Sequence, residues 1–181
     1  RRLRNAALGT AAMTIMNARF SLSSVVQAVG CAVGVLGRLA RAIAPLVLRI
    51  ALALPFFRSG LTRWDGFLSL SQSAAYLFEE EFKLHIFGSV YDIPMPLLAA
   101  HITGIAEIVL PIMLVLGLGT RFAALGLLVM TGVIQLVVPD GWANFHLPWA
   151  AMALGLIALG PGPLSLDHLL ERLCHAGAPG S

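Results

Sequence analysis

Four stretches of this sequence are apolar over about the length that crosses a lipid bilayer, and they restrict the possible folds more than any other feature. They comprise residues 42–61, 96–118, 122–139 and 146–160. A transmembrane helix needs about 20 mainly apolar residues. Because hydrocarbon offers the backbone no hydrogen-bond partner, such stretches must be helical to satisfy their own peptide groups. The sequence therefore predicts an all-α fold, a transmembrane four-helix bundle.

The composition excludes a soluble domain. Only 12% of the 181 residues are charged and 58% are hydrophobic, whereas soluble domains carry about 25% charged residues. The formal net charge of +3 is small, and there is no basic stripe with interleaved aromatic residues of the kind that binds nucleic acid. We therefore expect the lipid bilayer to be the main partner, and we do not expect nucleic acid to be a partner.

Basic residues beside the apolar stretches predict the orientation. Arginines precede the first stretch, follow the second and lie in the C-terminal tail: Arg19, Arg38, Arg41, Arg121 and Arg172. The loop of residues 62–95 has more carboxylates than basic residues, and the loop of residues 140–145 has no basic residue. Basic loops stay in the cytoplasm. We expect a multi-pass protein of the bacterial inner membrane with both termini in the cytoplasm.

The chain divides into three parts by composition. Residues 1–41 form a basic N-terminal segment that we expect to be interfacial or loosely ordered. The stretch 20–37 within it leaves an extra span or a cleaved leader as alternatives. Since residue 1 is Arg, Met13 or Met16 is an alternative start. Residues 42–170 form the membrane domain, and residues 171–181 form a short cytoplasmic tail.

The first outer loop carries apolar residues at helical spacing. They are Phe67, Leu70, Ala74, Leu77, Phe78 and Phe82. Glu79, Glu80 and Glu81 extend away from this stripe. The spacing predicts an amphipathic helix that covers the outer mouth of the bundle.

Two ionisable residues interrupt the apolar stretches. Arg49 lies in the first and Glu107 in the second. Because a charge in the bilayer core faces the bundle and needs a partner, we expect these two residues to form a buried pair. Thr103, one turn before Glu107, and Arg121 are accessory polar candidates. The pair is interpreted as an assembly clamp, with a site for a quinone head group or a proton as the alternative.

Three histidines fall at the predicted outer face. His85 ends the loop helix, while His101 and His146 begin the second and fourth spans. Together with nearby carboxylates they suit copper or zinc, but no spacing such as HxxxH enforces ligation. The competing interpretation is hydrogen bonding at the interface. Haem ligation by His101 and His146 is disfavoured because both lie near the interface and no second pair exists.

The two cysteines, Cys31 and Cys174, are far apart and form no CxxC motif. Dithiol redox chemistry and a thiolate zinc site therefore both lack their residues.

Several short motifs together resemble the bacterial DoxX family. They are an arginine in the first helix (Arg49), the S-G-x-x-[KR] that follows it (Ser59, Gly60, Arg63), an intramembrane glutamate (Glu107) and the G-L-x-[TS]-R turn (Gly117, Leu118, Thr120, Arg121). The likeness covers about residues 45–170, in the branch with a long LFEEEFKLHIFG loop.

This resemblance implies a four-helix membrane bundle associated with quinol or thiosulfate:quinone oxidoreductase systems. It carries over no catalytic residue, and the chain lacks the cysteine pairs of some redox-active relatives. The expected function is a non-catalytic accessory or anchor subunit with a membrane or redox-complex partner. A quinone-binding oxidoreductase subunit that uses Glu107 and Arg49, and metal or small-molecule handling through the outer histidines, are the alternatives.

Overall fold

The computed structural model describes the backbone of residues 2–176 and the side chains of residues 26–174. It is mostly helical, and four of its helical stretches are long and apolar enough to cross a membrane: Val26–Leu61, Pro96–Leu116, Thr120–Val137 and Pro139–Leu159. The prediction of an all-α membrane bundle is confirmed. The chain forms two compact units, Arg1–Arg41 and Ala42–Ser181.

The first helix, α1, is longer than the predicted span. It runs over Arg2–Leu61, so that residues 20–37, expected to be interfacial or loosely ordered, are helical. Residues 42–61 of α1 belong to the second unit. Pro55 lies inside this part of the helix, and Leu52, Ala53 and Phe56 are buried in the core.

Three further long helices complete the bundle: α3 (Pro96–Leu116), α4 (Thr120–Val137) and α5 (Leu147–Leu159). A three-residue turn joins α3 to α4, and Gly117 and Gly119 take positive φ angles of 71° and 56° there. The short helices η2 (Pro139–Gly141) and η3 (Trp142–His146) connect α4 to α5. The core contains small residues such as Ala123, Ala124 and Ala153, which let membrane helices approach closely.

The loop between α1 and α3 contains both helix and strand. Helix α2 (Gln72–Tyr76) and the π-helix η1 (Leu77–Glu81) lie between two hairpins, β1 (Trp64–Gly66) with β2 (Ser69–Leu70), and β3 (Lys83–Ile86) with β4 (Ser89–Asp92). Both hairpins are antiparallel, and β3 pairs with β4 from Lys83↔Asp92 to Ile86↔Ser89.

The predicted loop helix is therefore correct only in its central part. Ala74 and Phe78 are buried as the helical spacing requires, but Phe67 lies in the β1–β2 turn and Phe82 follows η1. The helix begins after Ser71 because the Ser71 hydroxyl accepts a hydrogen bond from the Ala74 N–H, which makes Ser71 its N-cap. Phe87 and Gly88 both have positive φ angles, as the type I′ form of a two-residue hairpin turn requires.

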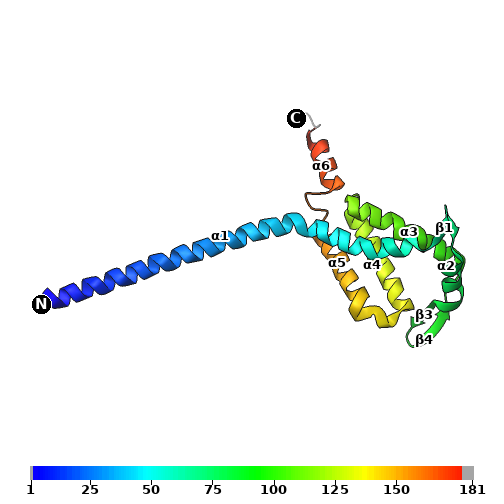
Figure 1. The fold of residues 1–181 in the computed structure, drawn as a ribbon, viewed down its shortest axis with the longest axis horizontal. Coiled ribbons are helices and arrows are strands. Elements are labelled where there is room, and N and C mark those ends of the chain that lie inside the picture. The colour runs from blue at the N-terminus through cyan, green and yellow to red at the C-terminus, as the bar shows by residue number, and fades with distance from the viewer. Residues whose placement is uncertain (1, 177–181) are drawn as a thin grey trace. The chain divides into compact units, whose positions relative to one another are not determined.

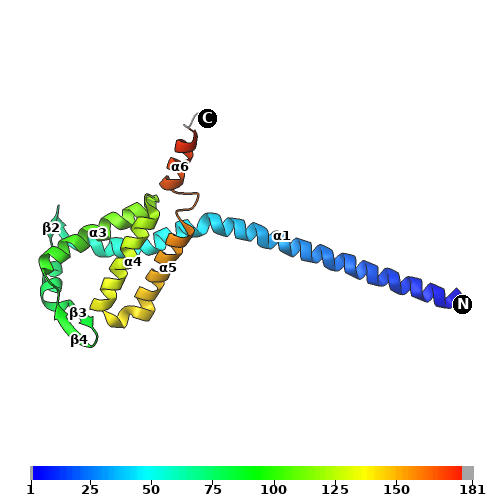
Figure 2. The same ribbon diagram turned by 180° about the vertical axis from the view of Figure 1, so that it is seen from behind.

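The loop elements gather at one end of the bundle. Figures 1 and 2 show α2, β3 and β4 beside the ends of α3 and α4 in both views. The His85 ring shares a hydrogen bond of 3.2 Å with the carbonyl of Leu136, the second-to-last residue of α4. The opposite end holds the α3–α4 turn and the start of α6 (Leu166–Ala176). We refer to these as the loop end and the turn end.

Candidate functional site

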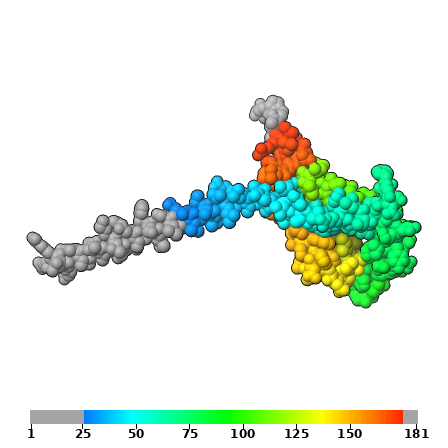
Figure 3. Space-filling view, viewed as in Figure 1, coloured from blue at the N-terminus to red at the C-terminus, as the bar shows by residue number. Residues whose placement is uncertain are grey.

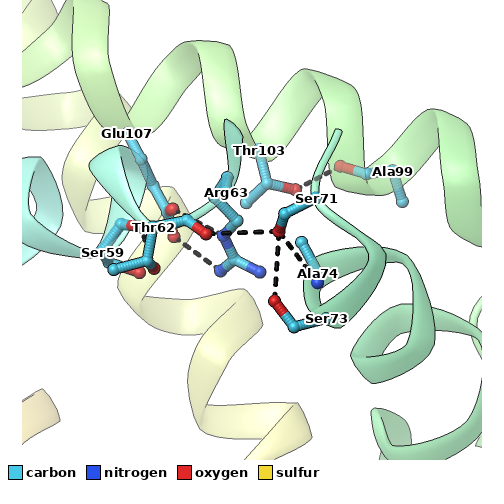
Figure 4. Close-up of polar contacts among 9 residues, drawn as sticks. All are labelled: Ser59, Thr62, Arg63, Ser71, Ser73, Ala74, Ala99, Thr103 and Glu107. Carbon is cyan, nitrogen blue, oxygen red and sulfur yellow. Dashed lines mark hydrogen bonds and ion pairs between the residues drawn. The ribbon is translucent and has the colours of Figure 1, made fainter. Parts of the chain in front are cut away.

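Glu107 lies in the middle of α3, and its partner is Arg63. The Arg63 Nε donates to Glu107 Oε2 at 2.9 Å, and Nη2 donates to Oε1 at 3.0 Å. The side chains are 11% and 2% exposed, respectively. Figure 4 shows the guanidinium of Arg63 lying alongside the carboxylate. Such a two-point charge-assisted contact satisfies both carboxylate oxygens at a depth where water is scarce.

The expected pairing of Arg49 with Glu107 is wrong. Arg49 instead donates to the carbonyl of Val115 at 3.4 Å, eight residues after Glu107. At about 1.5 Å of rise per residue this is about 12 Å along α3. The antiparallel register of the two helices places Gly60, not Arg49, opposite Glu107. A Cβ atom on Gly60 would lie only 3.0 Å from the Glu107 backbone carbon and Cβ.

The close approach at Gly60 brings Arg63, just beyond the end of α1, within reach of Glu107. Ser71 then holds the Arg63 backbone, because its N–H donates to the Arg63 carbonyl at 2.8 Å. The Ser71 hydroxyl also donates to the Thr62 carbonyl at 3.3 Å. Phe78 of η1 packs against the Arg63 guanidinium, whose carbon lies 5.0 Å from the ring centroid. The loop helices thus position the cation that neutralises Glu107.

Beside this ion pair lies a cavity of about 440 Å³, which we call the Arg63 cavity. Its lining is mainly apolar and comes from α1, the loop, α3, α4 and α5: Pro55, Phe56, Ser59, Arg63, Phe78, Phe82, Leu84, Ile93, Pro94, Ala99, Thr103, Glu107, Val133, Ile134, Val137, Val138 and Trp149. An apolar pocket with a few convergent polar groups is the usual form of a small-molecule site.

Of the two accessory polar candidates, one lies at this cavity. Thr103 lines it, and its hydroxyl donates to the Ala99 carbonyl one turn earlier (Figure 4). Arg121 is exposed at the turn end, where its guanidinium lies near Gly160. The structure therefore places Thr103 with Glu107 and separates Arg121 from both.

Arg49 is fully buried at the turn end. Besides the Val115 carbonyl, its guanidinium donates from Nη2 to the Leu164 carbonyl. Val115 is one of the last residues of α3, whose terminal carbonyls have no partner within the helix. A buried cation there also complements the negative end of the helix dipole. Gly117 is required beside it, since its φ angle is positive and a Cβ atom would crowd Arg49 Nη1 and lie only 2.9 Å from Ser165 Cα.

Asp167, the second residue of α6, supplies the opposite charge. Its carboxylate accepts hydrogen bonds from the N–H groups of Gly119 at 2.8 Å and Thr120 at 2.9 Å. It therefore caps the start of α4 from a distant part of the chain. Burial raises the pKa of Asp167, but the hydrogen bonds from Thr120 and Gly119 together with the charge of Arg49 outweigh it, and the net pKa lies below its usual value.

The outer histidines do not form a metal site. His101 shares a hydrogen bond of 2.7 Å with the Leu97 carbonyl, and His146 one of 2.5 Å with the side chain of Gln135. His85 contacts Leu136, as described above. Among residues 26–174, no group of three His, Cys, Asp or Glu side chains could hold a metal ion. Although the three residues share an end of the bundle, they extend from different elements toward different backbone and side-chain partners.

Sequence reasoning missed Arg63 as a site residue, although it noted the Ser59-Gly60-x-x-Arg63 motif. The motif itself held the signal: the glycine permits helix contact, and the arginine one turn later reaches the neighbouring helix. Asp167 and Trp149 were also missed. Asp167 acts through its contact with α4, and Trp149 acts by lining the cavity. No local sequence pattern predicts either contact.

Comparison with known proteins places the chain in a family. A sequence model of the DoxX family matches residues 44–140, more than half of the chain. The chain belongs to the DoxX family. An uncharacterized protein of Haemophilus influenzae is 29% identical over 140 residues, which cover 71% of this chain and 83% of that protein. No solved structure matches the chain. The family match ends at residue 140, so that it includes Arg49, Arg63 and Glu107 but not Asp167.

The ion pair of this DoxX protein predicts a specific pattern of energetic coupling. Breaking a buried pair by removing one partner costs about 3–5 kcal/mol, whereas replacing both charges with apolar groups is often nearly neutral. Arg63→Leu and Glu107→Leu should each lower the free energy of unfolding in detergent, and the double variant should recover much of the loss.

The matched control is the cycle of Arg49→Leu with Glu107→Leu. Because these residues share no partner, their effects should add to within about 0.5 kcal/mol. A larger coupling for Arg49 with Glu107 than for Arg63 with Glu107 would show that the register of α1 against α3 is wrong.

The Asp167 contacts predict a pH-dependent loss of stability. A carboxyl group whose pKa is lowered by folding stabilises the folded state at any pH above the pKa of the unfolded chain, which is about 3.9. This stabilisation is lost as the pH falls through the pKa of the folded state. Asp167→Asn should lower the free energy of unfolding by about 1–2 kcal/mol at neutral pH, because the neutral amide replaces a carboxylate that accepts two charge-assisted hydrogen bonds.

The difference between wild type and Asp167→Asn should shrink as the pH is lowered, and it can be followed by thermal unfolding. Asp65→Asn, at an exposed position, is the matched control and should have little effect at neutral pH. A constant difference across the acidic range would contradict the role given to the Asp167 charge.

Proposed function

We propose that this protein is a non-catalytic accessory subunit of a quinone-linked redox assembly in the bacterial inner membrane, and that it binds the quinone head group in the Arg63 cavity. The observation that carries the proposal is a mainly apolar cavity of about 440 Å³ with one buried, mutually neutralised ion pair on its wall. The volume falls within the range of about 300–1,000 Å³ that is usual for small-molecule sites.

The polar groups of the cavity suit a neutral ligand with carbonyl oxygens. Glu107 already neutralises the charge of Arg63, so a ligand that brought its own charge would remain uncompensated in an apolar site. Arg63 Nη1 makes no hydrogen bond within the described residues, which leaves it free to donate to a ligand oxygen. Ser59 and Thr103 add hydroxyl groups on the same wall.

The rest of the lining suits a flat ring with a lipophilic tail. Phe56 and Trp149 are in mutual ring contact, with centroids 5.1 Å apart, and both line the cavity. Aromatic pairs of this kind pack well against a further ring. Val133 and Val138 also line the cavity while remaining 50% and 44% exposed. The cavity therefore reaches the outer surface of the bundle, where a tail could pass into lipid.

The accessory role rests on the sequence as well as on the cavity. Cys31 and Cys174 provide no dithiol that could carry electrons, and the buried charges near the cavity are occupied with each other. A partner subunit would supply the electron-transfer chemistry, and this chain would hold and orient the quinone.

Binding of a short-tailed quinone analogue to the purified full chain tests the proposal. The double variant Arg63→Met with Glu107→Leu removes the donor without leaving a buried charge, and it should bind at least about tenfold more weakly, because a hydrogen bond to a charged group contributes about 1.5–3 kcal/mol and 1.4 kcal/mol is tenfold. Ala99→Phe should abolish binding by filling the cavity. Binding can be measured by equilibrium dialysis in mild detergent.

Leu98→Phe is the matched control, since Leu98 is the neighbouring residue of α3 and is half exposed outside the cavity. It should bind as wild type does. Failure of folded wild-type protein to bind the analogue, or equal binding by Ala99→Phe, would contradict the proposal.

The proposed orientation places the loop end in the periplasm and the turn end in the cytoplasm. Arg121 follows the α3–α4 turn, and α6, which carries Arg172, begins at the same end. A clustering of basic residues on one side is the usual mark of the cytoplasmic face. The hydrogen bond between Asp167 and the start of α4 brings Arg121 and the helix that carries Arg172 to the same end of the bundle.

Reporter fusions test this orientation. Alkaline phosphatase fused after Glu81 or Gly141 should be active, because it would be exported, whereas a fusion after Thr120 should be inactive. Green fluorescent protein at the same sites is the complementary control and should give the opposite result. Alkaline phosphatase activity only in the Thr120 fusion would show that the topology is the reverse of the one proposed.

A further inference from the structure

Helix α6 has two chemically different faces. Its leucines recur at positions i, i+3, i+4 and i+7 and share one side, and all are exposed, by 38% to 61%: Leu166, Leu169, Leu170 and Leu173. The other side carries Asp167, His168, Glu171 and Arg172. We call the first set the leucine face. An exposed apolar stripe of this width on a short helix requires a partner.

The first turn of α6 is fixed at the boundary of the membrane-spanning helices. The Asp167 carboxylate binds the N–H groups of Gly119 and Thr120, and the Asp167 N–H donates to the Gly117 carbonyl at 2.9 Å. Thr120 is the first residue of one candidate span, and Gly117 follows the last residue of another. The leucine face therefore begins at the level where two spans meet the membrane surface.

Beyond this first turn, α6 stands clear of the bundle. Figures 1 and 2 show it projecting from the turn end in both views, and Figure 3 shows its surface extending away from the bundle. Its leucines are thus not covered by the described helices of the second unit. The covering partner must be something present at the membrane boundary itself.

We propose that α6 lies in the plane of the lipid–water interface, with the leucine face among the acyl chains next to the headgroups. Interfacial helices have this amphipathic pattern with low net hydrophobicity. The polar face, with Asp167, Glu171 and Arg172, would then face the headgroups and water. A lipid partner is favoured over a second copy because a coiled-coil seam needs apolar spacing over three or more heptads, whereas α6 has only 11 residues.

The test measures how deeply each face of α6 enters the membrane in the full chain. Starting from Cys31→Ser with Cys174→Ser, single cysteines replace Leu170, Leu173 or, as the matched control on the polar face, Glu171. Each variant is spin-labelled and reconstituted into phosphatidylethanolamine–phosphatidylglycerol vesicles. Collision rates with oxygen, which partitions into lipid, and with a nickel chelate, which stays in water, are then compared.

Labels at positions 170 and 173 should show a several-fold higher ratio of oxygen to nickel collisions than the label at position 171. Native Cys174, labelled in the Cys31→Ser protein, keeps all four leucines and should give an intermediate ratio. It provides a measurement that does not depend on replacing a leucine.

Two results would overturn the proposal. Equal nickel access at positions 170, 171 and 173 would place the leucine face in water. Strong dipolar broadening between labels at position 170 or 173 of different copies would identify a second chain as the partner.

Discussion

A carboxylate in the middle of a membrane helix has to be neutralised from within the protein, and this requirement organises one half of the structure. Glu107 is almost completely buried, and bare charge at that depth is strongly disfavoured. Its partner, Arg63, does not come from a membrane helix but from the segment just after α1. The loop that follows must therefore fold back and hold Arg63 in place, which Ser71 and Phe78 achieve. The Arg63 cavity forms where these groups meet α3, α4 and α5.

At the turn end the same requirement is met in another way. Arg49 is completely buried and is bonded to backbone carbonyls, not to a carboxylate. Asp167 provides the nearby negative charge while it caps α4. A cation at the C-terminal end of α3 and an anion at the N-terminal end of α4 both interact favourably with the helix dipoles. The C-terminal segment that begins at Asp167 is thereby attached to the bundle.

The sequence predicted the buried charges correctly but not their partners. Counting along apolar stretches locates Arg49 and Glu107 only to within their helices, whereas pairing depends on the register of α1 against α3. Gly60 sets that register by allowing backbone contact beside Glu107, and this places Arg49 near Val115. The three histidines show the same limit. Their common end of the bundle could be inferred from chain order, but the direction of each ring depends on partners such as Gln135.

The amino-acid sequence by itself determined the solvent of this protein, the four apolar stretches of its bundle and the burial of two charged residues, Arg49 and Glu107. These properties follow from composition and apolar length, because hydrocarbon admits only helices with satisfied backbones. The tertiary structure alone decided that Arg63 neutralises Glu107, that two hairpins flank the loop helix, and that Asp167 caps α4. The ion pair and the cap join residues 44 to 48 positions apart, and the geometry of such contacts is set by helix register and close packing and not by local pattern.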